Sequence, residues 1–371
     1  GRPYGMFFTC LLYLTIGPFF AIPRCATTSY TVGLEHILPE GHARLYLFLF
    51  TLAFFIAALL FSLYPGKILT WVGKILNPCF LVFLGILVIV AMLDPSASIS
   101  SVAPAGDYAT QPFFAGFLDG YNTMDILAGL AFGIVVVQVI QGLGVEDPDA
   151  VASNTVKAGV FSCLLMGVIY LAVTVVGVQS RGLFETSENG GIALAQIAQH
   201  YLGNVGLFIL AATVTLACLK TAVGLITSCG ETFADLFPGL MSYRSWAIVF
   251  TGVSFLFSNL GLSTIIEYSI PVLMFLYPLA ITLILLALFG RFYGHDRRVA
   301  VCVTVFTLVG ALYDFVRSLP LWLLTSCHLD GVLETLKETL PLAKLGLFWL
   351  CPALIGLALG LILHAMSGKK Q

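Results

Sequence analysis

The chain has 371 residues, of which 59% are hydrophobic and 10% are charged, with a mean hydropathy of +1.00 and a formal net charge of −2. A soluble domain averages about 25% charged residues, so this composition excludes an ordinary soluble protein and indicates an integral membrane protein. The slightly negative charge gives no indication of a nucleic-acid partner. The nine cysteines show no CxxC or Cys/His ligand spacing, so we interpret them as small core residues rather than disulfides or zinc ligands.

Apolar segments of membrane-spanning length recur along the whole chain. A helix needs about 20 such residues to cross the ~30 Å of hydrocarbon in a bilayer. Ten segments meet this criterion, at about 5–31, 44–63, 71–93, 113–141, 156–179, 204–230, 245–260, 264–290, 299–317 and 345–365. We therefore predict an all-α membrane protein with about ten transmembrane helices.

The loop charges predict how this array is oriented. If Arg2 is cytoplasmic, 10 lysines and arginines fall in inner loops and 5 fall in outer loops. This asymmetry follows the positive-inside rule. Two further segments, 185–202 and 318–344, are too polar to span, and each is predicted to hold a short amphipathic helix on the outer side.

The first span contains two prolines, Pro18 and Pro23, which predict a kink because each removes a backbone donor. Gly17 permits close approach of another backbone or of a ligand. Arg24 is costly at membrane depth. It either snorkels to the outer interface of a kinked packing helix or contributes to a substrate site, and the sequence leaves both interpretations open.

The run at 113–141 is apolar at both ends but polar in its middle, where it carries Asp119, Asn122, Thr123 and Asp125 among several glycines. A plain spanning helix has no use for these groups, whereas a broken helix exposes backbone N–H and C=O groups that bind a ligand. The alternative is that both carboxylates belong to an outer loop and the helix starts at Ile126. We predict the broken helix.

One face of the span at 204–230 is polar, since Lys220, Gly224, Thr227 and Ser228 recur at helical spacing. The adjacent hydroxyls offer hard oxygen ligands to a small cation, although such groups also serve as packing contacts between helices. Lys220 lies in mid-span, where it pairs with Asp125 or Asp119, loses its proton, or replaces a bound cation. The alternative for Lys220 is snorkelling.

Catalytic motifs are absent from the sequence. The segment YPGKI at 64–68 lacks Walker spacing, and neither HExxH nor a G-x-S-x-G elbow occurs. The sequence thus supplies no hydrolytic nucleophile and no nucleotide site, and we predict that the protein is not an enzyme.

Five motifs resemble those of the bacterial branched-chain amino acid:cation symporters, the branched-chain amino acid transport system II carriers. They are IGPFFAIPRCAT at 16–27, SLYPGK at 62–67, DGYNTMD at 119–125, ACLKTAVGL at 217–225 and SNLGLS at 258–263. The resemblance covers the whole chain.

This resemblance implies uptake of leucine, isoleucine and valine by symport with Na⁺ or H⁺ in the bacterial cytoplasmic membrane. No cofactor beyond the coupling ion and no obligate protein partner is implied. The implied fold is LeuT-like, with two inverted five-helix repeats and two extra helices. The chain 1–371 is then a single transporter domain, in which 1–93 belongs to the first repeat, 113–290 forms the second, and 299–365 holds the extra helices.

Candidate site residues follow from the same resemblance. The expected substrate neighbours are Gly17, Pro18, Phe19, Phe20, Gly120, Tyr121, Asn122, Thr123, Met124 and Asp125. Thr227 and Ser228, after Gly224, match the Thr-Ser pair that binds Na⁺ in the LeuT-like fold. Lys220 departs from the family pattern, in which uncharged residues are common, and could act there as a tethered cation.

The family has twelve spans. Because ten are predicted here, we expect this chain to lack the first two helices, including the unwound helix one. We therefore expect an N-terminally truncated polypeptide that does not transport by itself. Two alternatives remain open: a transporter of the same fold that carries another small solute, such as a nucleobase, or a non-transporting sensor, scaffold or truncated product.

Overall fold

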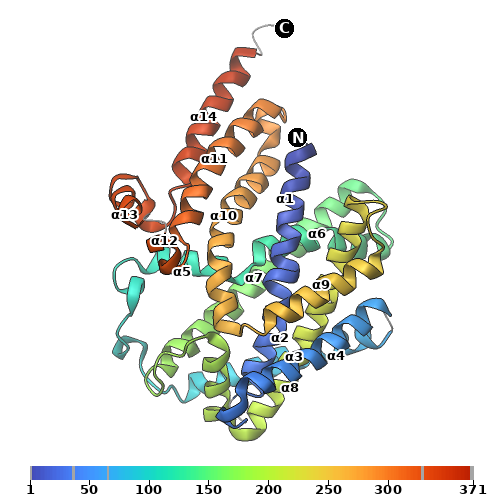
Figure 1. Ribbon diagram of the computed structural model, residues 1–371, viewed down its shortest axis with the longest axis vertical. Coiled ribbons are helices and arrows are strands. Elements are labelled where there is room, and N and C mark those ends of the chain that lie inside the picture. The colour runs from blue at the N-terminus through green and yellow to red at the C-terminus, as the bar shows by residue number, and fades with distance from the viewer. Residues whose placement is uncertain (1, 36–37, 65–66, 327–329, 368–371) are drawn as a thin grey trace. The chain divides into compact units, whose positions relative to one another are not determined.

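The computed structural model describes residues 2–35, 38–64, 67–326 and 330–367, and the regular elements within these ranges are all helical. Figure 1 shows their arrangement. The longer helices are α1 Arg2–Leu14, α2 Ala21–Gly33, α3 Ala43–Leu63, α4 Lys67–Leu93, α5 Pro112–Asp119, α6 Asp125–Gly142, α7 Pro148–Ser180, α8 Gly190–Leu236, α9 Tyr243–Ser258, α10 Leu262–Leu288, α11 Arg297–Arg317, α12 Leu321–Ser326, α13 Asp330–Thr339 and α14 Leu350–Ser367. Short turns are η1 Thr15–Phe19, η2 Glu40–His42, η3 Ile99–Ser101, η4 Gly106–Ala109, η5 Gly120–Thr123, η6 Gly290–Tyr293 and η7 Ala343–Leu345.

Local sequence sets where several of these helices begin. Asp147 accepts the Ala150 N–H at 2.8 Å before α7, and Pro148 occupies the first helical position. Asn189 accepts two N–H groups at the start of α8, and Asp296 accepts the Arg298 N–H at 2.9 Å before α11. These caps satisfy backbone donors that have no partner within the helix.

Six helices of the described residues are long and apolar enough to cross a bilayer, namely 3–33, 43–63, 148–180, 190–236, 262–288 and 297–317. Two shorter apolar helices cover Pro78–Leu93 and Leu350–Met366. Side chains of α7 are mostly exposed along an 18-residue stretch with a mean hydropathy of 2.3, as expected for a helix that faces lipid. The chain is therefore a multi-pass membrane protein. Each of the ten predicted spans lies on helical structure, while the count of ten itself stays a prediction.

The two predicted surface segments are helical as well. Residues from Gly190 form a helix that continues into the span, and Gly203 interrupts it with φ 65° and ψ −163°. Only glycine adopts this backbone region readily, so Gly203 separates the short first part from the spanning part. The second segment contains α13.

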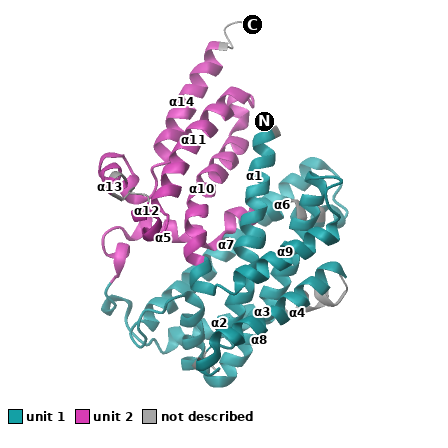
Figure 2. Ribbon diagram, in the orientation of Figure 1, with its two compact units in different colours: residues 1–103, 130–265 teal, residues 104–129, 266–371 magenta. Residues whose placement is uncertain are grey.

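The chain forms two compact units, which Figure 2 distinguishes by colour. Unit 1 comprises residues 1–103 and 130–265, and unit 2 comprises 104–129 and 266–371. The division of the chain into repeats, predicted from the family resemblance, concerns internal symmetry and remains a prediction.

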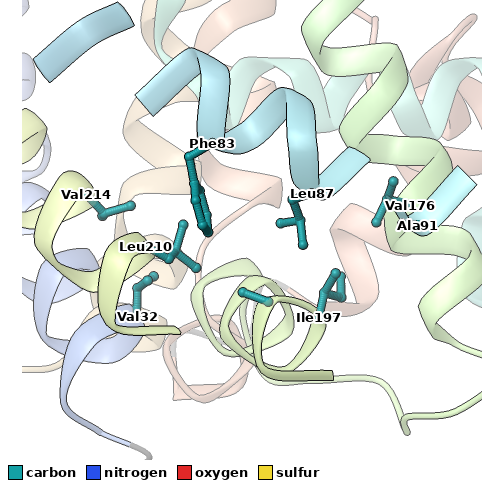
Figure 3. Close-up of a cluster of buried hydrophobic side chains, with 9 residues drawn as sticks. Val32, Phe83, Leu87, Ala91, Val176, Ile197, Leu210 and Val214 are labelled. Atoms are coloured by element: carbon teal, nitrogen blue, oxygen red, sulfur yellow. The ribbon is translucent and has the colours of Figure 1, made fainter. Parts of the chain in front are cut away.

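Each unit has its own apolar core. In unit 1, side chains of α2, α4, α7 and α8 form a buried cluster (Figure 3), which consists of Val32, Phe83, Leu87, Ala91, Val176, Ile197, Ala198, Leu210 and Val214. In unit 2, α11 and α14 pack closely. A Cβ at Gly356 would lie 2.7 Å from the Cys302 carbonyl oxygen, and one at Gly360 would lie 2.8 Å from the Val299 Cα. Glycines at these positions let the two backbones approach, as small residues do in membrane helix pairs.

Candidate functional site

The polar stretch in the run 113–141 breaks the helix, as predicted. The helix α5 ends at Asp119, residues 120–123 form a 3-10 turn, and α6 begins at Asp125. Met124 lies between them in the left-handed region with φ 61°. The Thr123 hydroxyl donates to the Gly120 carbonyl at 2.7 Å, which holds the turn. The alternative, in which both carboxylates belong to an outer loop, concerns where the bilayer lies along these helices and stays open.

Aromatic rings form a wall beside this break within unit 2. Tyr121 stacks on Tyr277 of α10 with ring centroids 4.1 Å apart and planes 11° apart. Phe117 meets Tyr121 edge-on at 5.6 Å. Tyr121 is 4% exposed, and its polar neighbours are the Trp349 indole and the Asp314 carboxylate. The two stacked tyrosines are buried, so the exposed ring of Phe117 is the part of this wall that offers apolar contact area beside the break.

The other predicted residues of the break differ in exposure. Gly120 and Thr123 are exposed, Asn122 and Asp125 are half-buried and have interaction partners, and Met124 is buried. The Asp119 carboxylate accepts the Tyr108 hydroxyl from η4 at 2.6 Å. This hydrogen bond, with smaller effects of burial and of the carboxylate charge, raises the pKa of Tyr108 to about 12. The Asp119 carboxylate is therefore hydrogen-bonded to the loop that precedes α5.

In unit 1, the first span is distorted at Gly17, which has non-helical angles of φ −90° and ψ −119° within η1. Pro18 follows directly, and α2 restarts at Ala21. The predicted kink is therefore present, but it comes from Gly17 and Pro18 alone. Pro23 is the third residue of α2, where the backbone N–H of a helix has no intrahelical partner and its loss costs little.

The distorted turn lies against α8 and α9. A Cβ on Gly17 would be 2.7 Å from the Cys229 sulfur of α8, so the close approach expected at this glycine is made by a side chain. The Cys229 thiol donates to the Tyr13 carbonyl at 3.5 Å, and Phe19 meets Phe257 of α9 edge-on at 5.3 Å. Phe20 is buried.

The four predicted cation-site residues lie on α8, all half-buried. The Thr227 hydroxyl lies 3.4 Å from the Tyr243 hydroxyl, which also donates to the Ser62 carbonyl at 2.8 Å. Positions 227 and 229 are about 200° apart on a helix. Since Cys229 contacts η1, Thr227 is turned toward Tyr243 and away from η1.

Lys220 has no ion pair within the described part of unit 1. Groups of three or more His, Cys, Asp or Glu side chains that could hold a metal ion are absent from the described residues. Na⁺ would instead require hydroxyl and carbonyl oxygens as ligands, and clusters of His, Cys, Asp and Glu do not include these. The cation site therefore stays a prediction.

One buried acid was not singled out from the sequence. Asp314 of α11 is 3% exposed, and its Oδ2 accepts the Trp349 N–H at the start of α14 at 3.4 Å. Its other oxygen has no hydrogen-bond partner in the described residues. Asp314 lies inside a predicted span, and an acidic residue in that position is itself the signal that would have identified it.

Apolar helices of spanning length, interrupted by non-helical turns with polar or aromatic neighbours, define a multi-pass membrane protein with discontinuous helices. Such helices are typical of transport proteins. The family described as branched-chain amino acid transport protein matches residues 1–367, and the chain belongs to this family.

Several relatives match nearly the whole chain. The branched-chain amino acid permease BrnQ of Lactobacillus delbrueckii subsp. lactis is 48% identical over 368 residues, which cover 99% of this chain and 82% of that protein. BrnQ of Bacillus subtilis is 37% identical, covering 99% and 81%. The branched-chain amino acid transport system 2 carrier protein of Pseudomonas aeruginosa is 38% identical, covering 100% and 82%. The names of these relatives describe transport proteins rather than enzymes.

Proposed function

We propose that this protein is a secondary active transporter that imports leucine, isoleucine and valine by symport with Na⁺ or H⁺ across the bacterial cytoplasmic membrane. The observation that carries the proposal is the helix break at 120–124 with its aromatic wall, in a chain of the branched-chain amino acid transport family. The fold is LeuT-like with ten of its helices in this chain, and the protein works by alternating access.

Substrate recognition divides between backbone and side chains. The N-terminal end of α6 attracts the carboxylate and the C-terminal end of α5 attracts the ammonium group, because helix dipoles favour these charges. Phe117, which is exposed, contacts the aliphatic side chain, and the buried Tyr121 positions Phe117 through their edge-on contact. Such an apolar contact separates substrates that differ by one methylene by only about 1–3 kcal/mol. Overlapping selectivity for the three amino acids follows.

The coupling ion is proposed to bind at α8. Thr227 and Ser228 supply hydroxyl oxygens, and Gly224 leaves the backbone accessible, since nothing beyond the adjacent part of α8 lies within 4 Å of where its Cβ would be. Lys220 stands one helical turn before Gly224 and adds a tethered positive charge. In a full-length homologue, we expect Lys220→Thr to increase the Na⁺ dependence of uptake, and identical sodium curves for the two proteins would contradict this role.

Competition for uptake tests the substrate class. In cells that express the protein, excess valine or leucine should inhibit isoleucine uptake, whereas a nucleobase should not. Tyr121→Ala should reduce uptake at least tenfold at equal expression, while Tyr268→Ala, which removes an exposed tyrosine of α10, should leave uptake unchanged. If excess valine does not inhibit isoleucine uptake, or if a nucleobase does inhibit it, the result would favour a transporter of another small solute. Absence of any uptake would favour a non-transporting sensor, scaffold or truncated product.

A further inference from the structure

An apolar groove lies among α10, η6, α11 and α14, all within unit 2, and has a volume of about 400 Å³. Figure 1 shows these three helices running alongside one another. The groove is lined almost entirely by hydrocarbon, and representative side chains are Leu285, Phe289, Val303, Trp349, Leu357 and Leu361. The surface offers a small zwitterion no charged group, so this groove is not suited to the proposed substrate.

The groove has the length of one leaflet of a bilayer. On α14 it extends from Trp349 to Leu361, which is roughly 18 Å at 1.5 Å per residue. Half of the ~30 Å hydrocarbon core is about 15 Å. A single acyl chain therefore matches the groove in depth as well as in polarity.

Basic residues adjoin the residues that line one end of the groove. Phe289, Phe292 and Tyr293 line it, and the exposed Arg291 lies among them in sequence. Arg297 and Arg298 follow at the start of α11 and are also exposed. On α14, His364 lies near the same end of the groove. It is one helical turn beyond Leu361 and contacts Asp296 at 2.8 Å.

Among the described residues, the acidic side chain at this end is that of Asp296, and it already has hydrogen-bond partners. Asp296 accepts the Arg298 N–H at 2.9 Å and contacts His364, and both hydrogen bonds lower its pKa, the backbone one more strongly. It therefore stays ionised in local contacts, and the arginine side chains give this end an excess of positive charge.

We propose that the groove is a binding site for an anionic phospholipid, with one acyl chain between α10, α11 and α14 and the phosphate headgroup held by Arg291, Arg297 and Arg298. Apolar burial supplies affinity for any acyl chain, whereas the arginines supply selectivity for negative charge through charge-assisted hydrogen bonds to phosphate oxygens. This site goes beyond the proposed transport function and does not depend on it.

Trp349 provides a reporter because it lines the groove. The chain has four tryptophans, so replacing Trp71, Trp246 and Trp322 by phenylalanine leaves Trp349 as the sole fluorophore. The protein is reconstituted in vesicles of zwitterionic phosphatidylcholine that contain increasing fractions of phosphatidylglycerol with brominated acyl chains, which quench indole fluorescence on contact. Brominated phosphatidylcholine in the same series is the comparison lipid.

We expect Trp349 to be quenched at a mole fraction of brominated phosphatidylglycerol about 10- to 100-fold lower than that of brominated phosphatidylcholine. Arg291→Gln should weaken this preference about fivefold, and the triple change of Arg291, Arg297 and Arg298 to glutamine should abolish it. Arg244→Gln, which removes an exposed arginine at the start of α9, should have no effect.

Equal quenching by the two lipids at every fraction would overturn the proposal, since the groove would then hold bulk lipid. Little quenching by either lipid would also overturn it, and crosslinked dimers would then identify a second copy of the chain as the occupant. If the triple variant is misfolded by its elution profile, raising the ionic strength on the parent protein replaces it. The preference for phosphatidylglycerol should then fall with salt, and a salt-independent preference would contradict the role of the arginines.

Discussion

At the scale of single residues, Cys229 limits the size of the side chain that fits at Gly17. A Cβ at position 17 would lie 2.7 Å from the Cys229 sulfur, which is closer than side chains pack without displacement. We expect Gly17→Ala to destabilise the protein by about 1–3 kcal/mol, as overpacking does. Thermal unfolding in detergent measures the effect.

The control for Gly17 uses the same substitution where space is free. Nothing beyond the adjacent part of α8 lies within 4 Å of a Cβ at Gly224, so Gly224→Ala should stabilise α8 by about 0.5–1 kcal/mol. Cys229→Ala removes the sulfur, and in that background Gly17→Ala should cost less. An unchanged cost would show that the backbone angles of Gly17, and not the contact, determine the loss.

Asp314 stabilises the start of α14 by accepting a hydrogen bond from the Trp349 N–H. Asp314→Ala removes the acceptor and leaves a buried donor unpaired, so the protein should lose about 1–3 kcal/mol of stability. Asp314→Asn keeps an acceptor oxygen without a buried charge and should be at least as stable as the parent. The two unfolding temperatures are compared in the same detergent. A large loss with Asn would show that the negative charge itself is required.

Tyr108 gives stability a dependence on alkaline pH. Its pKa is raised to about 12, chiefly by the hydrogen bond that its hydroxyl donates to Asp119, so the folded protein holds this proton more tightly than the unfolded chain. The contribution to stability is complete below about pH 10, the ordinary pKa of tyrosine, and is lost as the pH rises through about 12. Unfolding temperatures of the parent and of Tyr108→Phe should therefore differ most below pH 10 and converge by about pH 12. A constant difference would contradict this assignment.

At the scale of the elements, the break between α5 and α6 depends on Met124, a non-glycine residue with φ 61°. Left-handed backbone costs about 1–2 kcal/mol for an L-residue, and branching at Cβ adds to the crowding. Met124→Ile should therefore destabilise the protein by about 1–2 kcal/mol more than Met124→Leu, although both replacements are apolar and of similar size. Equal unfolding temperatures would mean that the break relaxes into another conformation.

The elements that the sequence predicted well are those with a local physical signal. The break around Asp119–Asp125 was predictable because polar residues interrupt an apolar run, and the kink near Gly17 because Pro18 removes a backbone donor. The distinction between Pro18 and Pro23 was not predictable, since it depends on where α2 restarts. The stacking of Tyr121 on Tyr277 and the contact of Asp314 with α14 join segments far apart in the chain, and no local pattern encodes them.

At the scale of the whole molecule, loop charges do not determine the number of spans. The ten predicted spans place 10 lysines and arginines inside and 5 outside. If only the six long apolar helices cross the bilayer, Arg291, Arg297 and Arg298 move outside while Arg317, Lys337 and Lys344 move inside, and the totals stay the same. The positive-inside rule therefore fits both topologies equally.

Labelling of introduced cysteines separates these topologies. Ten spans place Ser98 and Thr335 outside and Glu146 and Phe292 inside, whereas six spans place Phe292 outside and the other three inside. We expect Ser98→Cys and Thr335→Cys to react in intact cells with a membrane-impermeant maleimide, and Glu146→Cys and Phe292→Cys to react only after the cells are permeabilised. The parent gives the background, since its own cysteines lie mostly within apolar runs. Labelling of Phe292→Cys in intact cells, with Ser98→Cys protected, would instead establish six spans. The predicted LeuT-like arrangement would then fail, because its repeats require α4, the broken α5–α6 segment and α9 to cross the bilayer.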